Sequence, residues 1–183
     1  VASALGLILL SPLFALIALQ VKLSSRGPVF YSQERIGLYG LPFCIFKFRT
    51  MIDHAEEEGL PQLTHDNDPR ITKIGHWLRK YRLDELPQLW NILRGDMSIV
   101  GPRPERPFFI EQIMKEAPYY CLLYKVRPGL TSWGPIRVGY TDTTEKMIER
   151  LNCDIVYVEN MSLLLVLKIL FFTTGVIIKG KGK

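Results

Sequence analysis

The uncharged apolar segment at residues 1–21 constrains the fold more than any other feature of the sequence. At about 1.5 Å of helix per residue it is long enough to cross a bilayer core of about 30 Å. Pro12 lies at its middle and removes one helical hydrogen bond, while the Ser11 hydroxyl is able to bond a carbonyl that the proline leaves free. We therefore expect a bent membrane helix. A cleaved signal peptide is not expected, because the segment is too long and no positively charged region precedes it.

Two adjacent carboxylates, Asp84 and Glu85, stand where a helix is predicted to begin. An apolar helical face follows them, formed by Leu86, Leu89, Trp90 and Leu93. A preceding helix is predicted over residues 71–82, and its Arg79 and Arg82 are one turn apart, so both cations are able to face the carboxylates. Adjacent acids with cations upstream indicate a site that handles phosphates and a metal ion.

The alternative for Asp84 is a helix N-cap, which is the commonest role of an aspartate at such a position. A capping side chain accepts a hydrogen bond from the backbone N–H of the second or third helical residue. With Asp84 as the cap, the third residue is Pro87, which has no N–H to donate. The context therefore favours a functional role.

Arg103 lies between Pro102 and Pro104, which hold the backbone extended. A guanidinium on a stiff segment loses little entropy when it binds a phosphate with two hydrogen bonds. A proline-rich surface loop with solvated charges is the alternative.

Residues 29–33 and 43–49 are predicted to form two strands of a hairpin, joined through Gly37 and Gly40. The alternation of a strand places Lys47 and Arg49 on the same face. Their charges either protect an edge strand or contact a substrate, and both interpretations stay open here.

The net charge of +5 and the pI of about 9.1 favour anionic partners. No zinc-finger spacing or basic helical arm is present, so nucleic acid is not an expected partner. Three scattered cysteines indicate neither a disulfide framework nor a thiolate metal site. The apolar residues 161–178 precede a basic tail at 179–183, which suits an anionic lipid surface, and a buried core helix is the alternative.

Several long motifs follow one another along the chain: an apolar segment broken by Ser11-Pro12, Lys47-Phe-Arg-Thr-Met51, Leu78-Arg79, Leu83-Asp-Glu-Leu-Pro-Gln-Leu-Trp-Asn91, Gly95-Asp-Met-Ser98, Gly101-Pro-Arg-Pro104, Arg127-Pro-Gly-Leu-Thr131 and Tyr157-Val-Glu-Asn160. With these motifs the chain resembles, nearly from end to end, the bacterial sugar transferase family. These are monotopic polyprenyl-phosphate hexose-1-phosphate transferases, also called phosphoglycosyl transferases. The family usually has Gly-Trp-Ala-Gln around Trp133, where this chain has Ser132-Trp133-Gly134-Pro135.

The resemblance implies an α+β fold that is mainly α. A re-entrant membrane helix at residues 1–22, broken at Ser11 and Pro12, would enter and leave on one face. Residues 23–183 would form the catalytic domain, with a small β-hairpin and associated helices at the membrane interface, and both parts would act as one unit. The implied location is the cytoplasmic face of the bacterial inner membrane. A homo-oligomer stays open, as does a longer chain of which this is the catalytic part.

The resemblance also implies transfer of a sugar-1-phosphate from a UDP-sugar to polyprenyl (undecaprenyl) phosphate with release of UMP. This would be the first membrane step of polysaccharide or glycoconjugate assembly, for example of exopolysaccharide or O antigen. Asp84 would attack the phosphorus that bears the sugar and form an aspartyl-phosphosugar, with ping-pong kinetics. Asp84 and Glu85 would hold Mg²⁺, and Glu85 has the alternatives of acting as a base or of orienting Asp84. The expected phosphate-binding cations are Lys47, Arg49, Arg79 and Arg103.

Two other functional classes fit part of the sequence. A noncatalytic basic membrane protein accounts for the apolar ends and the positive charge, but not for Asp84-Glu85 or for Arg103 between its prolines. A nucleic-acid-binding module accounts for the charge and predicts affinity that falls steeply with salt.

Overall fold

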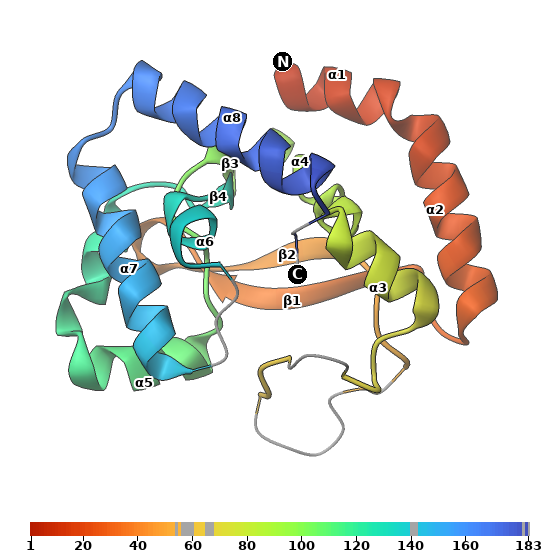
Figure 1. Cartoon of the computed structure of the whole chain (residues 1–183), viewed down its shortest axis with the longest axis horizontal. Helices are drawn as coiled ribbons and strands as arrows, with labels where there is room; N and C mark the ends of the chain where they lie inside the picture. Colours follow the sequence, from red (N-terminus) through yellow and green to blue (C-terminus); the bar gives the residue numbers. More distant parts are fainter. Residues whose placement is uncertain (54, 56–60, 65–67, 140–142, 181, 183) are drawn as a thin grey trace.

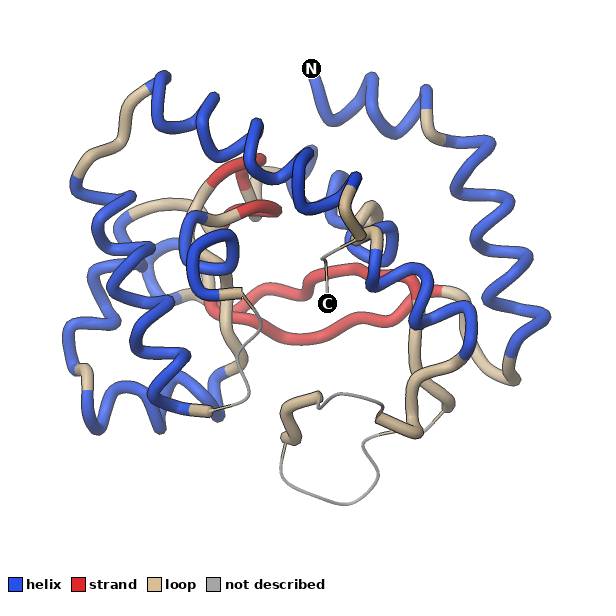
Figure 2. Tube along the Cα trace, viewed as in Figure 1, coloured by secondary structure: helices blue, strands red, loops and turns tan. Residues whose placement is uncertain are grey.

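The computed structural model describes residues 1–53, 55, 61–64, 68–139, 143–180 and 182. A two-stranded antiparallel hairpin of β1 (Phe30–Ile36) and β2 (Pro42–Phe48) lies at the centre of the molecule, and helices surround it (Figure 1). The hairpin and the mainly helical fold agree with the prediction. A short parallel pair, β3 (Ser98–Val100) and β4 (Gly129–Thr131), was not predicted, and Figure 2 shows it apart from the hairpin.

The N-terminal segment forms two helices, α1 (Ala2–Leu9) and α2 (Ser11–Ser24), bent by 59° at their junction. The Ser11 hydroxyl donates to the Ile8 carbonyl at 2.8 Å. Ile8 lies four residues before Pro12, so its carbonyl would otherwise accept the helical N–H that proline lacks. The predicted bend is confirmed.

Among the described helices, none alone is long and apolar enough to cross a membrane. The bent pair of α1 and α2 meets the criteria of length and composition jointly, as a broken span or a re-entrant loop would.

The inner face of α2 packs on the hairpin and on α3 (Lys73–Lys80). Ile17 and Val21 of α2, Phe48 of β2 and Leu78 of α3 form a buried cluster. This cluster attaches the N-terminal helices to the strand that carries Lys47.

The helix predicted over residues 71–82 ends earlier, because Arg82 adopts a left-handed backbone with φ of 54°. The helix predicted at Asp84 begins later, as α4 (Gln88–Arg94). Asp84 and Glu85 occupy the 3₁₀ turn η2 (Leu83–Glu85) instead. Pro87 has no N–H for an α-helical bond to Leu83, and the Leu83 carbonyl accepts the shorter-range bond from Leu86 N–H at 3.3 Å.

Two further clusters involve the C-terminal half of the chain. The first contains residues of α5 (Pro107–Glu116), the 3₁₀ segment η3 (Pro118–Lys125) and α7 (Thr144–Glu159). The second joins Val100 of β3, Tyr157 of α7 and Ile169 of α8 (Leu163–Ile178), and the short helix α6 (Trp133–Val138) packs against it through Trp133. Together they place α7 beside the chain that follows β3.

Among the described helices, four expose two or more large apolar side chains, which include Leu5, Ile8 and Leu9 on α1, Leu16, Leu19 and Leu23 on α2, Trp90 and Leu93 on α4, and Leu163, Leu164, Leu167 and Phe171 on α8. In α4 the buried residues are polar, Gln88 and Asn91, which is the reverse of an ordinary surface helix in water. The predicted apolar face of α4 therefore exists but points partly outward. Exposed apolar surface of this extent indicates contact with lipid or protein.

Candidate active site

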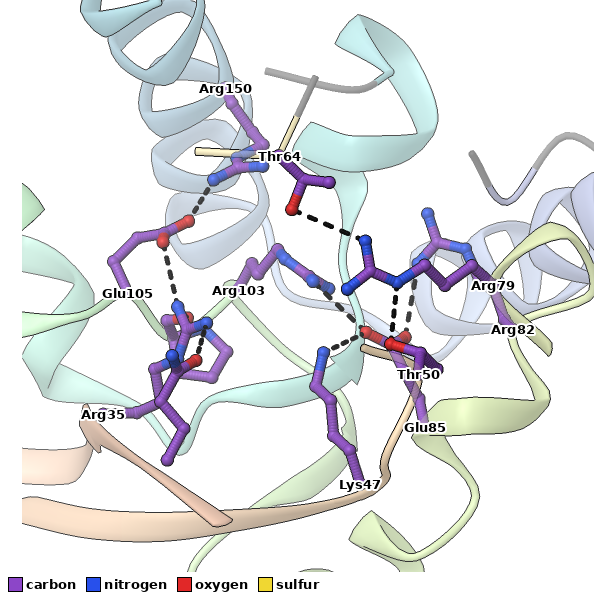
Figure 3. A network of polar contacts seen from close by, with 12 residues as sticks. Arg35, Lys47, Thr50, Thr64, Arg79, Arg82, Glu85, Arg103, Glu105 and Arg150 are labelled. Carbon is purple, nitrogen blue, oxygen red and sulfur yellow. Dashed lines mark hydrogen bonds and ion pairs between the residues drawn. The ribbon is translucent and has the colours of Figure 1, made fainter. Parts of the chain in front are cut away.

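Glu85 and three cations come together from three separate parts of the sequence (Figure 3). Glu85 comes from η2 and Lys47 from β2. Arg103 comes from the loop after β3, and Arg82 from the left-handed residue before η2. The tight turn at Arg82 brings its side chain back to Glu85, as the sequence predicted.

Glu85 is held by cations on both carboxylate oxygens. Its Oε1 accepts from Lys47 Nζ at 2.9 Å and from Arg103 Nη2 at 3.2 Å. Its Oε2 lies 3.6 Å from Arg82 Nη1. Burial raises the pKa of Glu85, but these cations outweigh it and hold that pKa well below its usual value of 4.5. Glu85 is therefore a fixed negative charge and a weak base.

Asp84 has the opposite environment although it is the adjacent residue. Its side chain is buried, and it makes no hydrogen bond or ion pair with any residue that the structure describes. Burial, and next the like charge of Glu85, raise the pKa of Asp84 above its usual value of 3.8, while Lys47 and Arg79 oppose that rise. A desolvated carboxylate without hydrogen bonds is a stronger nucleophile than one already bound to donors.

Arg79 lies at the edge of this cluster. Its Nε donates to the Thr50 hydroxyl at 2.9 Å and its Nη1 to the Thr64 hydroxyl at 3.5 Å. Its charge acts on Asp84 through space, as its effect on the Asp84 pKa indicates.

Arg49 is not brought to this cluster. It lies just beyond β2, and its Nη2 donates to the Ser25 carbonyl at 2.8 Å and to the Ser25 hydroxyl at 3.0 Å. The side chain is buried beside Gly27, where a Cβ would lie only 2.1 Å from Nη1. Arg49 thus ties the end of α2 to the hairpin, a third role beside the two considered from the sequence.

Four residues that sequence reasoning missed surround the Arg103 loop: Arg35, Glu105, Arg150 and Asp154. Arg35 Nη1 donates to the Pro104 carbonyl and to Glu105 Oε2, both at 3.1 Å, and Arg150 pairs with the other Glu105 oxygen (Figure 3). Arg35, Lys47, Glu85 and Arg103 also line one small hollow. The sequence held one indication of this site: Arg150 and Asp154 are charged residues one turn apart on a helix, so they lie on the same helical face.

Asp84 and Glu85 fit a magnesium ion that takes its remaining ligands from water and substrate. Among the described residues, no three His, Cys, Asp or Glu side chains gather as a ready metal site. Mg²⁺ commonly uses only one or two carboxylates and takes its other ligands from water and substrate phosphates. The Asp84 oxygens lack a donor from the described residues, so they are able to accept a cation beside Glu85.

Comparison with known proteins gives a consistent result over the whole chain. A family model described as bacterial sugar transferase matches residues 1–180. A protein of Aeromonas hydrophila named UDP-N-acetylgalactosamine-undecaprenyl-phosphate N-acetylgalactosaminephosphotransferase is 40% identical over 181 residues, which cover 99% of this chain and 43% of that protein.

Two relatives are named UDP-glucose:undecaprenyl-phosphate glucose-1-phosphate transferase. The one from Escherichia coli strain K12 is 46% identical over 175 residues, covering 94% of this chain and 38% of that protein. The one from Caulobacter vibrioides is 45% identical over 177 residues, covering 94% of this chain and 65% of that protein. The chain thus spans less than half the length of the Aeromonas and Escherichia relatives. A match over residues 1–180 with such identities establishes that the chain belongs to the bacterial sugar transferase family.

Proposed function

We propose that the chain transfers a sugar-1-phosphate from a UDP-sugar to undecaprenyl phosphate and releases UMP. The names of its relatives support the two substrates. The observation that carries the proposal is the contrast within one dipeptide. Asp84 is buried without a hydrogen bond to any described residue, whereas Glu85 beside it is bound by Lys47, Arg82 and Arg103.

In the first step, an Asp84 oxygen attacks the phosphorus that bears the sugar. A phosphorus–oxygen bond forms to Asp84, the bond to the bridging oxygen of the diphosphate breaks, and its electron pair leaves with UMP. The enzyme then holds an aspartyl-phosphosugar. Glu85 is a poor candidate for a general base because its low pKa leaves little proton affinity near neutral pH.

Cations around the carboxylates supply the electrostatic part of this step. Negative charge is spread over the phosphoryl oxygens as the bonds exchange, so fixed positive groups stabilise the transition state. Lys47 and Arg103 already lie at the carboxylate pair, bound to Glu85. The Arg103 side chain is 26% exposed, which leaves part of its guanidinium accessible to a phosphate.

In the second step, a phosphate oxygen of undecaprenyl phosphate attacks the same phosphorus. The bond to Asp84 breaks, the free carboxylate returns, and the product is undecaprenyl-diphospho-sugar. No net proton transfer to the protein is required. Two displacements at one phosphorus predict ping-pong kinetics.

Asp84 and Glu85 are the residues that would hold Mg²⁺. The ion would neutralise charge on the diphosphate and polarise its oxygens. Among the described residues no third His, Cys, Asp or Glu side chain gathers with these two, so water and substrate phosphate oxygens would supply the other ligands.

The acceptor lipid places the reaction at a membrane, and we propose the cytoplasmic face of the bacterial plasma membrane. The exposed apolar side chains of α1, α2, α4 and α8 support this location. The bent pair α1–α2 would enter one leaflet and return, and the body of the chain would stay on one side. The exposed Lys179 at the end of α8 would face anionic headgroups, and Lys181 and Lys183 lie outside the described residues.

The test is UMP release from UDP-glucose and UDP-N-acetylgalactosamine, with and without undecaprenyl phosphate and Mg²⁺. A labelled sugar-phosphate and no acceptor should give a hydroxylamine-sensitive adduct on the intact protein. Asp84→Asn keeps the shape of the side chain but removes the nucleophile, so it should form no adduct while remaining folded. An equal adduct on this variant would refute the role of Asp84, and no UMP release from any UDP-sugar would refute the function.

A further inference from the structure

The helix α7 contacts the segment that carries Arg103 at several points between Val100 and Glu105. Three buried side chains on one face of α7 contact this segment: Arg150, Asp154 and Tyr157. In order they meet Glu105, the backbone of Arg103 and the Val100 carbonyl. The segment therefore runs antiparallel to the helix, in register with positions i, i+4 and i+7.

Asp154 makes the central contact of this series. Arg103 has the only backbone N–H in Pro102-Arg103-Pro104, and it donates to Asp154 Oδ2 at 3.1 Å. The Gly134 N–H donates to Asp154 Oδ1 at 2.7 Å, and the Ser132 hydroxyl lies 2.5 Å and 2.7 Å from the two oxygens. A single buried carboxylate thus joins α7, the start of α6 and the Arg103 loop.

The side chain of Arg103 faces the opposite way, toward the carboxylate pair. Its Nη2 lies 3.2 Å from Glu85 Oε1 (Figure 3). The backbone of Arg103 is therefore fixed by Asp154 while its guanidinium reaches the reacting groups. Within the described part of the chain, Asp154 makes no hydrogen bond or ion pair with Asp84 or Glu85.

We propose that Asp154 is a positioning residue for Arg103, holding its backbone so that the guanidinium meets the phosphoryl group in transfer. This role rests on the proposed function. The carbonyls of Pro102 and Pro104 accept from the Gly129 N–H and from Arg35 Nη1, but Asp154 holds the one backbone N–H of this tripeptide, because the flanking prolines have none. A misplacement of about 1 Å at a reacting centre costs roughly 100-fold in rate.

Asparagine is not able to replace Asp154 without a loss, for a geometric reason. The Arg103 N–H and the Gly134 N–H address different oxygens of the carboxylate. An amide offers an acceptor at one of these sites and an NH₂ donor at the other, so one backbone N–H always faces a donor. Asp154→Asn should therefore displace either the Arg103 loop or the start of α6.

The experiment is a double-mutant cycle with Asp154→Asn and Arg103→Ala in the full chain. The single-turnover rate of adduct formation from labelled UDP-sugar is measured with enzyme in excess, and thermal unfolding reports the fold. With Arg103 present, Asp154→Asn should lower the rate roughly 100-fold. With Arg103→Ala, the same change should lower it by less than about threefold, because coupled residues are not additive. Ser132→Ala leaves the Arg103 N–H bond in place and should cause a clearly smaller loss.

Equal losses from Asp154→Asn in both backgrounds would overturn the positioning role, since a general structural effect does not depend on Arg103. A loss from Ser132→Ala as large as that from Asp154→Asn would also overturn it. In both cases the unsubstituted chain is active, whereas an inactive unsubstituted chain would refute the proposed function and this role with it. If Asp154→Asn does not fold, Asp154→Ser is used instead, because it removes the carboxylate without adding volume. Its loss of rate is then compared between the chain with Arg103 and the chain with Arg103→Ala.

Discussion

The Lys47 ammonium lies 2.9 Å from Glu85 Oε1, and its charge also acts on the carboxylate of Asp84, which makes no hydrogen bond with the described residues. Burial lowers the pKa of Lys47, and the negative charge of Glu85 opposes part of this decrease. The charged form of Lys47 therefore depends on Glu85. Conversely, Lys47 is the first of the cations that oppose the raised pKa of Asp84. The two acids and this lysine form one electrostatic unit.

Lys47→Met should move the acid limb of adduct formation to higher pH. Asp84 attacks as a carboxylate, so the rate is retained above its pKa and lost as the pH falls through it. That pKa is already raised above 3.8, and removal of Lys47 raises it further. Adduct formation without acceptor is the measurement, because an acceptor phosphate itself titrates near pH 6, at about its second pKa.

The control for this shift is Lys115→Met, which removes an exposed lysine on α5. Its acid limb should coincide with that of the unsubstituted chain. An unchanged limb in Lys47→Met, or one moved to lower pH, would contradict the coupling between Lys47 and Asp84.

Arg103→Lys should lower kcat roughly 100-fold although the charge is kept, a loss comparable to that of one transition-state donor. An ammonium is a point charge and does not reproduce the planar fork of a guanidinium. Arg94→Lys is the matched control, because Arg94 is half exposed and pairs with Asp96 at 3.4 Å outside the carboxylate cluster. Steady-state UMP release measures both variants, and near-normal turnover of Arg103→Lys would make Arg103 a generic surface charge.

Arg49→Met should reduce stability more than catalysis. The change removes two hydrogen bonds to Ser25 from a buried site and leaves the Ser25 carbonyl without that donor, at a cost of about 1–3 kcal/mol. Thermal unfolding should shift downward, while the rate per folded molecule at low temperature stays close to normal. A loss of UDP-sugar binding in a variant of unchanged stability would instead return Arg49 to the substrate site.

Features that depend on local chemistry could be predicted from the sequence. The bend follows from a serine beside a proline, and its hydrogen bond to Ile8 is local. The hairpin follows from strand alternation and turn glycines, and its register pairs Tyr31 with Lys47. Adjacent acids followed by a proline-flanked arginine likewise marked Glu85 and Arg103, whose side chains do meet.

The remaining features depend on tertiary contacts that no local pattern specifies. β3 and β4 are three residues long, too short for a readable alternation, and they pair because Gly101 and Gly129 let the backbones approach closely. Arg49 and Lys47 share a predicted strand face, but the strand ends at Phe48 and Arg49 turns to Ser25. The face of α7 that binds the Arg103 loop is polar and buried, so its burial could not be inferred from hydrophobic periodicity.

Replacing Ser11 and Pro12 with Ala and Leu should move the start of the chain across the membrane. The break between α1 and α2 depends on the missing proline N–H and on the Ser11 bond to Ile8. Without the break, residues 2–21 would continue as one helix of about 30 Å, enough to span the bilayer core. A cysteine at Ala2 should then react with an impermeant label from the side opposite to a cysteine at Lys22, in a chain whose three native cysteines are serines. In the unsubstituted segment both positions should label from the same side, and labelling from opposite sides there would make α1–α2 an ordinary span and refute the re-entrant topology.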